Sequence, residues 1–316
     1  MNNAITVRQD TDPERLIALV TNGKAANTAA AYRSAILDFQ SWVMATGYGF
    51  SREGVLAYVQ HLRLLDYASS SINLRLTALR QLAHEVRFDP LATPDDRAAA
   101  EGIIAVNGIA KRGRRMGHWL TTEEASQLLE VPDLGTLKGK QEFLVLALLL
   151  GCALRREEAA NLTFDQIQQR DGKWLIVNLI GKGDKTRSVH VAPWVLAAIR
   201  SWQNAAELES GKILRAVSKS DYLTGPVETR GGGMTDGGMS KQAIYSIIKQ
   251  TAAAIGMPEL GPHSLRRTWA QRAYRLGYPI DQIRITLGHE SIRTTEVYLG
   301  LTGLDIDNPI HVDFGE

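Results

Sequence analysis

Apolar residues recur at helical spacing through the first third of the chain. Between residues 27 and 44, Tyr32, Ile36, Phe39 and Val43 follow one another at spacings of four, three and four, which places them on one face of an amphipathic helix. The same pattern predicts helices over residues 51–65, with Leu56, Val59 and Leu62 facing inward, over residues 71–86 and over residues 93–105. Four such helices are typical of one small helical bundle.

The second part of the chain alternates helical patterns with short runs that are typical of strands. Residues 141–150 are almost entirely apolar, which predicts a buried helix that ends at Gly151. Two β-rich runs, at residues 173–180 and 187–192, flank a Gly-Lys-Gly-Asp turn and predict a hairpin. Further helices are expected to begin near Thr121, Pro193 and Ser240. The expected fold class is mainly α with a small β-sheet: a helical bundle followed by a mixed α/β domain.

Length and composition indicate two packed domains. The chain has 316 residues, 44% of them hydrophobic, which is enough for two cores. We expect a helical domain over residues 1–105, a basic linker over 106–118 and a second domain over 119–316, which ends in a tail from residue 299. The N-terminal residues lack a signal-peptide pattern, and the longest apolar run is too short to cross a bilayer. With one cysteine, Cys152, and so no intrachain disulfide, the sequence favours a cytoplasmic protein with no membrane partner.

Charge is distributed unevenly along the chain. Residues 1–105 hold 10 Lys and Arg against 11 Asp and Glu, residues 106–298 hold 26 against 19, and residues 299–316 hold none against 4. The middle segment therefore has the positive surface that a polyanion such as DNA requires. The densest basic run consists of Lys111, Arg112, Arg114 and Arg115. We expect it to contact the DNA backbone without reading sequence, although a solvated linker has the same composition.

A group of residues near the C-terminus is suited to a phosphodiester. His263 and Arg266 are three residues apart, so on a helix they share one face. His289 precedes an N-cap residue, Ser291, which is expected to begin a short helix that carries Tyr298. A tyrosine hydroxyl has a pKa of about 10 and becomes a nucleophile only with help from cations and a base. Arginine supplies the cation and can clamp two phosphate oxygens, while histidine exchanges protons near pH 7.

Arg155 directly follows the most apolar segment of the chain. A guanidinium at the end of a buried helix is costly unless it has a negative partner or lines a polar cleft, so its position favours a functional role. Glu158 lies three residues further on and can support Arg155 through an ion pair, although ordinary surface pairs have the same spacing.

Four motifs in a fixed order resemble those of the tyrosine recombinase (phage integrase) family. They are CALRREEAANL around Arg155, IGKGDKTRSVHV over the hairpin, HSLRRTWA around Arg266, and LGHESIRTTEVY, which ends at Tyr298. The compact size is similar to that of Xer-like two-domain members. The resemblance implies a core-DNA-binding domain over residues 1–105 and a catalytic domain over 119–316.

The resemblance also implies an activity and the residues that perform it. The activity is site-specific recombination of DNA through a 3′-phosphotyrosyl intermediate, for integration, excision or resolution of a mobile element or replicon. Tyr298 would be the nucleophile; Arg155, Arg266 and His289 would stabilise the transition state, and His263 would handle the proton of the nucleophile.

On the predicted hairpin, the resemblance assigns the general acid to Lys182, with Lys185 as the alternative. Lys185 and Lys241 are further candidates for DNA contacts, although Lys241 also suits an amphipathic helix that faces the core. No metal or cofactor is expected, because arginines take the place of the cation that many phosphoryl-transfer sites use.

The expected partners are double-stranded DNA, further copies of the chain in a homo-tetramer on two DNA sites, and accessory recombination proteins. Two other functions fit the same fold. A type IB topoisomerase would use the same cleavage chemistry to relax supercoils as a monomer, and a non-catalytic DNA-binding protein would form no covalent adduct.

Overall fold

The structure is a computed structural model that describes residues 13–110, 117–181, 185–226 and 237–301. The chain forms two compact units, Met1–Arg115 and Met116–Glu316. The division between them falls inside the basic segment 106–118. The four residues of this segment that are predicted to contact DNA, Lys111, Arg112, Arg114 and Arg115, lie outside the described residues.

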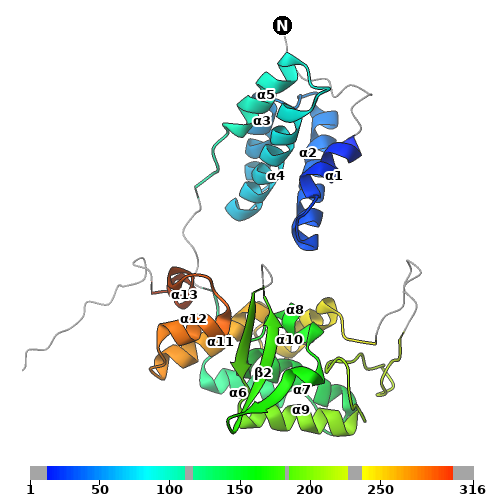
Figure 1. Ribbon diagram of the computed structural model, residues 1–316, viewed down its shortest axis with the longest axis vertical. Coiled ribbons are helices and arrows are strands. Elements are labelled where there is room, and N and C mark those ends of the chain that lie inside the picture. Colours follow the sequence, from blue (N-terminus) through cyan, green and yellow to red (C-terminus); the bar gives the residue numbers. More distant parts are fainter. Residues whose placement is uncertain (1–12, 111–116, 182–184, 227–236, 302–316) are drawn as a thin grey trace, which may run out of the picture. The chain divides into compact units, whose positions relative to one another are not determined.

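The first unit is a bundle of helices (Figure 1). Its described helices are α1 (Pro13–Thr21), α2 (Ala26–Thr46), α3 (Arg52–Leu64), α4 (Ser69–Phe88) and α5 (Pro94–Ile104). The prediction of four helices was wrong in number, because α1 adds a fifth. Its apolar residues Leu16, Ile17 and Val20 are buried, but a pattern of only 9 residues is too short to stand out in the sequence.

The inward face of α3 differs from the predicted one by one residue. Val59 and Leu62 are buried as predicted, whereas Leu56 is 44% exposed. Val55 takes the inward position, since residues 55, 59 and 62 form a continuous stripe along one side of a helix.

The second unit contains eight α-helices and three strands among its described residues. In chain order they are α6 (Thr122–Glu130), α7 (Leu137–Gly151), α8 (Arg156–Asn161), the 3-10 turn η1 (Phe164–Gln166), β1 (Ile167–Arg170), β2 (Lys173–Ile180), β3 (Thr186–His190), α9 (Pro193–Ala205), α10 (Lys241–Ala254), α11 (Pro262–Arg275), α12 (Ile280–Leu287) and α13 (Ile292–Leu299). The predicted fold class, mainly α with a small β-sheet, is confirmed.

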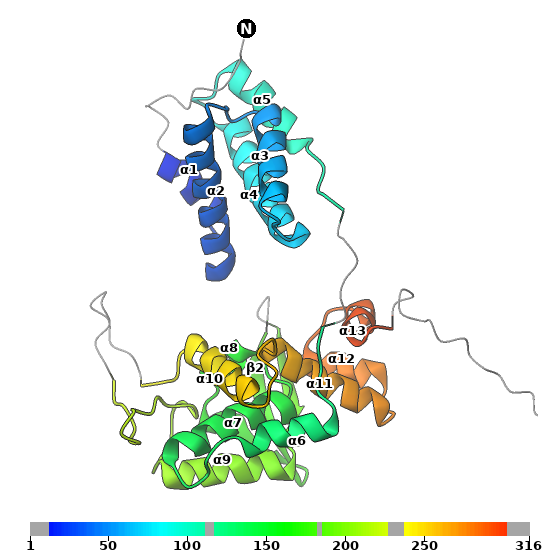
Figure 2. The ribbon, with the colours of Figure 1, turned by 180° about the vertical axis from the view of Figure 1, so that it is seen from behind.

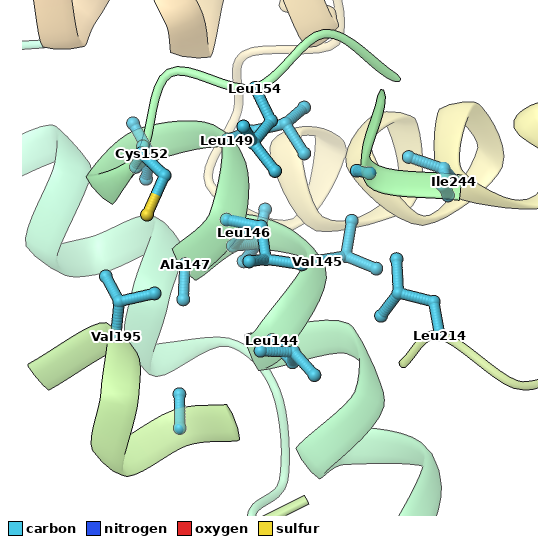
Figure 3. Packing of buried hydrophobic residues seen from close by; sticks show 14 of the residues in the cluster. Leu144, Val145, Leu146, Ala147, Leu149, Cys152, Leu154, Val195, Leu214 and Ile244 are labelled. Carbon is cyan, nitrogen blue, oxygen red and sulfur yellow. The ribbon is translucent and has the colours of Figure 1, made fainter. Parts of the chain in front are cut away.

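Helix α7 is the centre of the second unit. Every residue from Leu144 to Leu149 is fully buried, which confirms the buried helix predicted there. Figure 3 shows Leu144, Val145, Leu146, Ala147 and Leu149 of this run near Val195 of α9, Ile244 of α10 and Leu214 of the connecting loop. Gly151 lets α9 approach closely, because an added Cβ would lie 2.3 Å from a methyl group of Val195.

The sheet is antiparallel with strand order β1-β2-β3. The predicted hairpin corresponds to β2 and β3, and the turn between them includes Lys182, which lies outside the described residues. The prediction omitted β1, because its residues Ile-Gln-Gln-Arg carry no alternating apolar pattern. Figures 1 and 2 view the second unit from opposite sides. The sheet is in front in Figure 1, whereas α6 and α10 are in front in Figure 2, so α7 lies between the sheet and these two helices.

Helices α11, α12 and α13 form a smaller core at one side of the second unit (Figure 2). Ala153, just after α7, packs in this core with Ala270, Ile283, Leu287 and Leu299. Helix α12 also contacts β3, and α11 contacts α7. The end of α7, the start of α11, strand β3 and the end of α12 therefore meet. None of the described helices is long and apolar enough to span a membrane.

We predict that Leu146→Ala in α7 lowers the free energy of unfolding of the second unit by about 2–5 kcal/mol, because it removes buried methyl groups and leaves a cavity. Leu276→Ala is the control: Leu276 is 66% exposed, so its effect should stay within about 0.5 kcal/mol. Urea unfolding followed by tryptophan fluorescence measures both, since five of the six tryptophans lie in this unit. Equal losses for the two variants would contradict the central role of α7.

Candidate active site

A buried carboxylate joins two arginines from separate parts of the second unit. The side chain of Glu158, on α8, is only 4% exposed. Arg187 of β3 donates hydrogen bonds to both of its oxygens, at 2.7 and 2.8 Å. Arg155 donates to Oε2 from its backbone N–H at 2.7 Å and to Oε1 from Nη1 at 2.8 Å. Two planar guanidinium groups thus share one carboxylate, an arrangement that fixes the orientation of both.

Two opposing effects set the pKa of Glu158: its burial and its interactions with the two arginines. Burial alone would raise the pKa, because it disfavours the charged form. The hydrogen bonds and charge of Arg187, together with the hydrogen bonds from Arg155, act in the opposite direction and lower the pKa from 4.5 to about 2. The carboxylate is therefore ionised at neutral pH.

Three arginines converge on the carbonyl groups at the end of α12. Arg155 Nη2 donates to the carbonyls of Leu287 and Gly288, both at 3.1 Å, and Arg187 Nε donates to the carbonyl of Thr286 at 2.9 Å. Arg266 Nη2 also donates to the Leu287 carbonyl. The last carbonyls of a helix carry partial negative charge and have no partner within the helix, so they are natural acceptors for cations.

Two backbone features make this arrangement possible. Gly288 ends α12 in the left-handed conformation, with φ of 58°. A Cβ added there would lie 3.1 Å from Arg187 Cδ and 3.2 Å from its Nη1, so glycine also leaves space for the arginine. Ala153, between α7 and α8, presents its carbonyl to Nη1 of Arg266.

Arg266 is the most buried of the three arginines, at 2% exposure. Burial and the positive charge of Arg155 lower its pKa to about 9, while the negative charge of Glu158 acts against this shift. The guanidinium remains charged at pH 7, and its position on the first turns of α11 places it beside Arg155.

The two histidines of the site are neutral at pH 7. Burial of the His289 ring and the charges of Arg266, Arg155 and Arg187 lower the pKa of His289 to about 4. Its Nδ1 lies 3.0 Å from the hydroxyl of Thr295, which is fully buried. Burial of its ring and the charges of the neighbouring arginines, Arg266 first, also lower the pKa of His263, although the residue keeps an exposed edge.

Tyr298 lies on α13 against both histidines. Its hydroxyl donates to the backbone carbonyl of His263 at 3.1 Å, and its ring meets the His289 ring edge to face, with centroids 5.2 Å apart. The guanidinium of Arg267 covers the tyrosine ring at 4.8 Å from its centroid. Burial raises the pKa of the phenol, and the charges of Arg266 and Arg267 oppose that shift.

The structure brings together most of the residues that the sequence singled out. The exceptions are in the linker, on the hairpin and on α10. Lys182 lies outside the described residues. Lys185 pairs with Glu290, beside His289, at 3.0 Å, and Lys241 pairs with Glu157 at 2.6 Å. The described residues include no group of three or more His, Cys, Asp or Glu that would suit a metal ion.

Sequence reasoning missed the contribution of Arg187. Its motif was read only as a strand with lysines at the adjoining turn. A signal was present, because Arg187 is two residues before the buried Val189 and so shares the inward face of β3. An arginine on the inward face of a strand needs a carboxylate partner, and Glu158 is that partner.

Comparisons with known proteins identify the family of the chain. The family model described as "Phage integrase family" matches residues 118–303. Tyrosine recombinase XerD of Pseudomonas putida is 27% identical over 282 residues, which cover 87% of each chain. Tyrosine recombinase XerA of Thermococcus kodakarensis is 29% identical over 281 residues, which cover 89% of this chain and 86% of the relative.

Two solved structures share the fold. A lambda integrase dimer bound to a core site superposes with a TM-score of 0.65 at 12% identity, over 94% of this chain and 96% of that one. XerH recombinase bound to its difH substrate superposes with a TM-score of 0.60 at 17% identity, over 85% of this chain and 76% of that one. The chain belongs to the phage integrase family of tyrosine-type site-specific DNA recombinases.

Proposed function

We propose that the chain cleaves and rejoins DNA through Tyr298. The phenol oxygen attacks the scissile phosphorus, and the bond from phosphorus to the 5′ oxygen breaks. The products are a 3′-phosphotyrosyl link and a free 5′ hydroxyl. Attack by a 5′ hydroxyl from another strand reverses the step and releases the tyrosine. Each step exchanges one phosphoester bond for another, so strand exchange needs no ATP.

The observation that best supports this proposal is the convergence of Tyr298, two arginines and two histidines from distant parts of the sequence. We assign Arg155 and Arg266 to the non-bridging phosphate oxygens, whose charge grows in the transition state. Both side chains are held by carbonyl oxygens or a carboxylate before DNA arrives, so little reorganisation accompanies the reaction.

The histidines have protonation states that fit two different tasks. His263 is neutral at pH 7, and its backbone carbonyl accepts a hydrogen bond from the tyrosine hydroxyl. Because this contact brings the residue to the nucleophile, we assign its imidazole the proton of Tyr298. His289 engages Thr295 through Nδ1, and we assign its Nε2 to a phosphate oxygen. We propose Lys182 as the acid that protonates the departing 5′ oxygen, with Lys185 as the alternative.

We infer double-stranded DNA as the partner. The XerH and lambda integrase structures that share this fold are complexes with DNA sites. We propose that six basic residues contact the DNA backbone: Lys111, Arg112, Arg114, Arg115, Lys185 and Lys241. We further propose a cytoplasmic recombinase that integrates, excises or resolves a mobile element or replicon, with a core-DNA-binding domain over residues 1–105 and accessory recombination proteins as further partners.

Replacing the nucleophile tests the chemistry directly. Tyr298→Phe removes the attacking oxygen, so no denaturant-resistant protein–DNA adduct should form on nicked candidate sites from the flanking genomic or plasmid locus. Arg266→Ala should lower the rate of adduct formation by about 10²–10³-fold, by analogy with the loss of one oxyanion donor. Denaturing gel electrophoresis of trapped complexes measures both effects.

Tyr274→Phe is the matched control. Tyr274 lies on α11 in the same unit and is 41% exposed, so this variant should form the adduct as the native chain does. An adduct in the Tyr298→Phe variant would disprove the assignment of the nucleophile. Relaxation of supercoiled DNA without paired sites would instead favour the topoisomerase activity.

Neutralising Glu158 should weaken the fold in a pH-dependent way. The folded-state pKa of about 2 lies below the ordinary 4.5, so the ionised carboxylate stabilises the folded chain above pH 4.5 by about 3 kcal/mol. That contribution is lost as the pH falls from 4.5 toward 2. The loss of stability in Glu158→Gln should therefore be larger at pH 7 than at pH 3.5, as measured by urea unfolding of both proteins.

The neighbouring carboxylate provides the control for this experiment. Glu157 pairs with Lys241 at the surface, and an exposed pair contributes at most about 1 kcal/mol. Glu157→Gln should have a small effect at both pH values. A Glu158→Gln deficit that is equal at pH 7 and pH 3.5 would show that packing, and not the carboxylate charge, holds the two arginines.

We propose that the active assembly is a homo-tetramer on two DNA sites, because exchange between two duplexes requires cleavage of four strands. Native mass spectrometry of the protein with paired sites should give four protomers per two sites. A synapse that is competent for strand exchange with only one protomer per cleaved site would contradict this assembly.

A further inference from the structure

Arg266 and Arg267 are adjacent in the sequence but have different surroundings. Arg266 is buried and donates to the carbonyls of Ala153 and Leu287. Arg267 is only partly buried, and its guanidinium lies over the ring of Tyr298, 4.8 Å from the centroid. A cation over the face of an aromatic ring is attracted by the electrons of that ring. Arg267 therefore contacts the proposed nucleophile on the face of its ring.

The Arg267 guanidinium also lies close to the chain at Gly117. A Cβ added to Gly117 would lie 2.3 Å from Nη1 of Arg267 and 2.8 Å from its Cζ. Contacts this short do not occur between real atoms, so any larger residue at 117 would displace the guanidinium. Gly117 is the first described residue after the segment 111–116.

The chain that enters the second unit is anchored on α11 directly beside Arg267. The backbone N–H of Leu120 donates to the hydroxyl of Thr268 at 2.9 Å, and both residues are buried. Leu120 is three residues after Gly117, and Thr268 is the residue after Arg267. The backbone at Gly117 is therefore held against the guanidinium by a fixed attachment and not by chance proximity.

We propose that Arg267 is a positioning residue for Tyr298 and that the backbone at Gly117 holds Arg267 in place. The entry of the chain into the second unit is thereby coupled to the nucleophile, through one guanidinium that lies close to both. The catalytic meaning of this coupling rests on the proposed role of Tyr298, whereas the coupling itself is a property of the folded chain.

The charges around Tyr298 are consistent with this role. The phenol faces Arg266 and Arg267 on α11, Arg155 before α8, and the neutral His289. Arg267 is the one of these cations that stacks on the ring. We expect its loss to loosen the ring and to slow adduct formation by about two- to tenfold, the size of one cation–aromatic contact.

The experiment uses the full chain with 3-fluorotyrosine incorporated at position 298 and ¹⁹F NMR in the absence of DNA. The ¹⁹F resonance responds to a charge over the ring, and it requires no cleavage activity. Arg267→Gln should shift the resonance, and Gly117→Ala should shift it in the same direction. Arg267→Lys should give a smaller shift, because a cation remains but the planar stacking group is lost.

The matched control is Gly225→Ala. A Cβ at Gly225 meets no atom within 4 Å, so this variant should leave the resonance unchanged.

The double variant, with Arg267→Gln and Gly117→Ala, distinguishes coupling between the two residues from a general disturbance of the fold. In the Arg267→Gln background the guanidinium is absent, so Gly117→Ala should produce no further shift.

Each remaining outcome overturns part of the proposal. If Gly117→Ala leaves the resonance in place while Arg267→Gln shifts it, Gly117 does not hold the arginine. If neither variant shifts it, Arg267 does not position the tyrosine. If the two shifts add in the double variant, the residues act independently. If the native chain forms the adduct but the two variants leave the ¹⁹F resonance unchanged, this inference alone is wrong. If the variants shift the resonance as expected but the native chain forms no adduct, only the proposed chemistry is wrong.

Discussion

The catalytic unit depends on one buried carboxylate that is shared by two arginines. A lone carboxylate in this position would be unstable in its ionised form, because burial removes the water that solvates the charge. Glu158 remains ionised because four hydrogen bonds from Arg155 and Arg187 replace that water. In return, the carboxylate balances the charge of two cations that lie close to a third, Arg266.

This concentration of positive charge acts on both histidines and on the tyrosine. Together with burial, it lowers the pKa of each histidine, so both are neutral at pH 7 and can act as bases and hydrogen-bonding groups. It also acts on the phenol of Tyr298, where it counteracts the effect of burial. A phosphate group that enters the site would relieve the repulsion among the arginines, and so the same field that lowers the pKa of the histidines favours binding of the anion.

Much of this arrangement follows from local sequence patterns. The apolar run of α7 and the spacing of His263 and Arg266 predict where the helices lie and which side chains share a face. The ordered motifs identify the set of residues that converge. Contacts that depend on tertiary structure were not predictable in this way. The spacing of Arg187 gives its face on β3 but not its partner on α8, and nothing in the sequence indicates that Gly117 lies close to Arg267. Helix α1 and strand β1 were missed because short elements carry too little periodicity.

Most of the acceptors that orient the three arginines are main-chain carbonyls, those of Ala153, Thr286, Leu287 and Gly288. A substitution changes a side chain but leaves the carbonyl of its residue in place. Substitution of Thr286 or Leu287 therefore removes no hydrogen-bond acceptor, provided that the backbone of α12 is unchanged. Among the described residues, Glu158 is the one side chain that accepts hydrogen bonds from these arginines. The sensitivity of the network to mutation is therefore concentrated at Glu158 and at Gly288, whose left-handed conformation ends α12. Relatives can thus diverge widely around this site and still present the same cations to a phosphate.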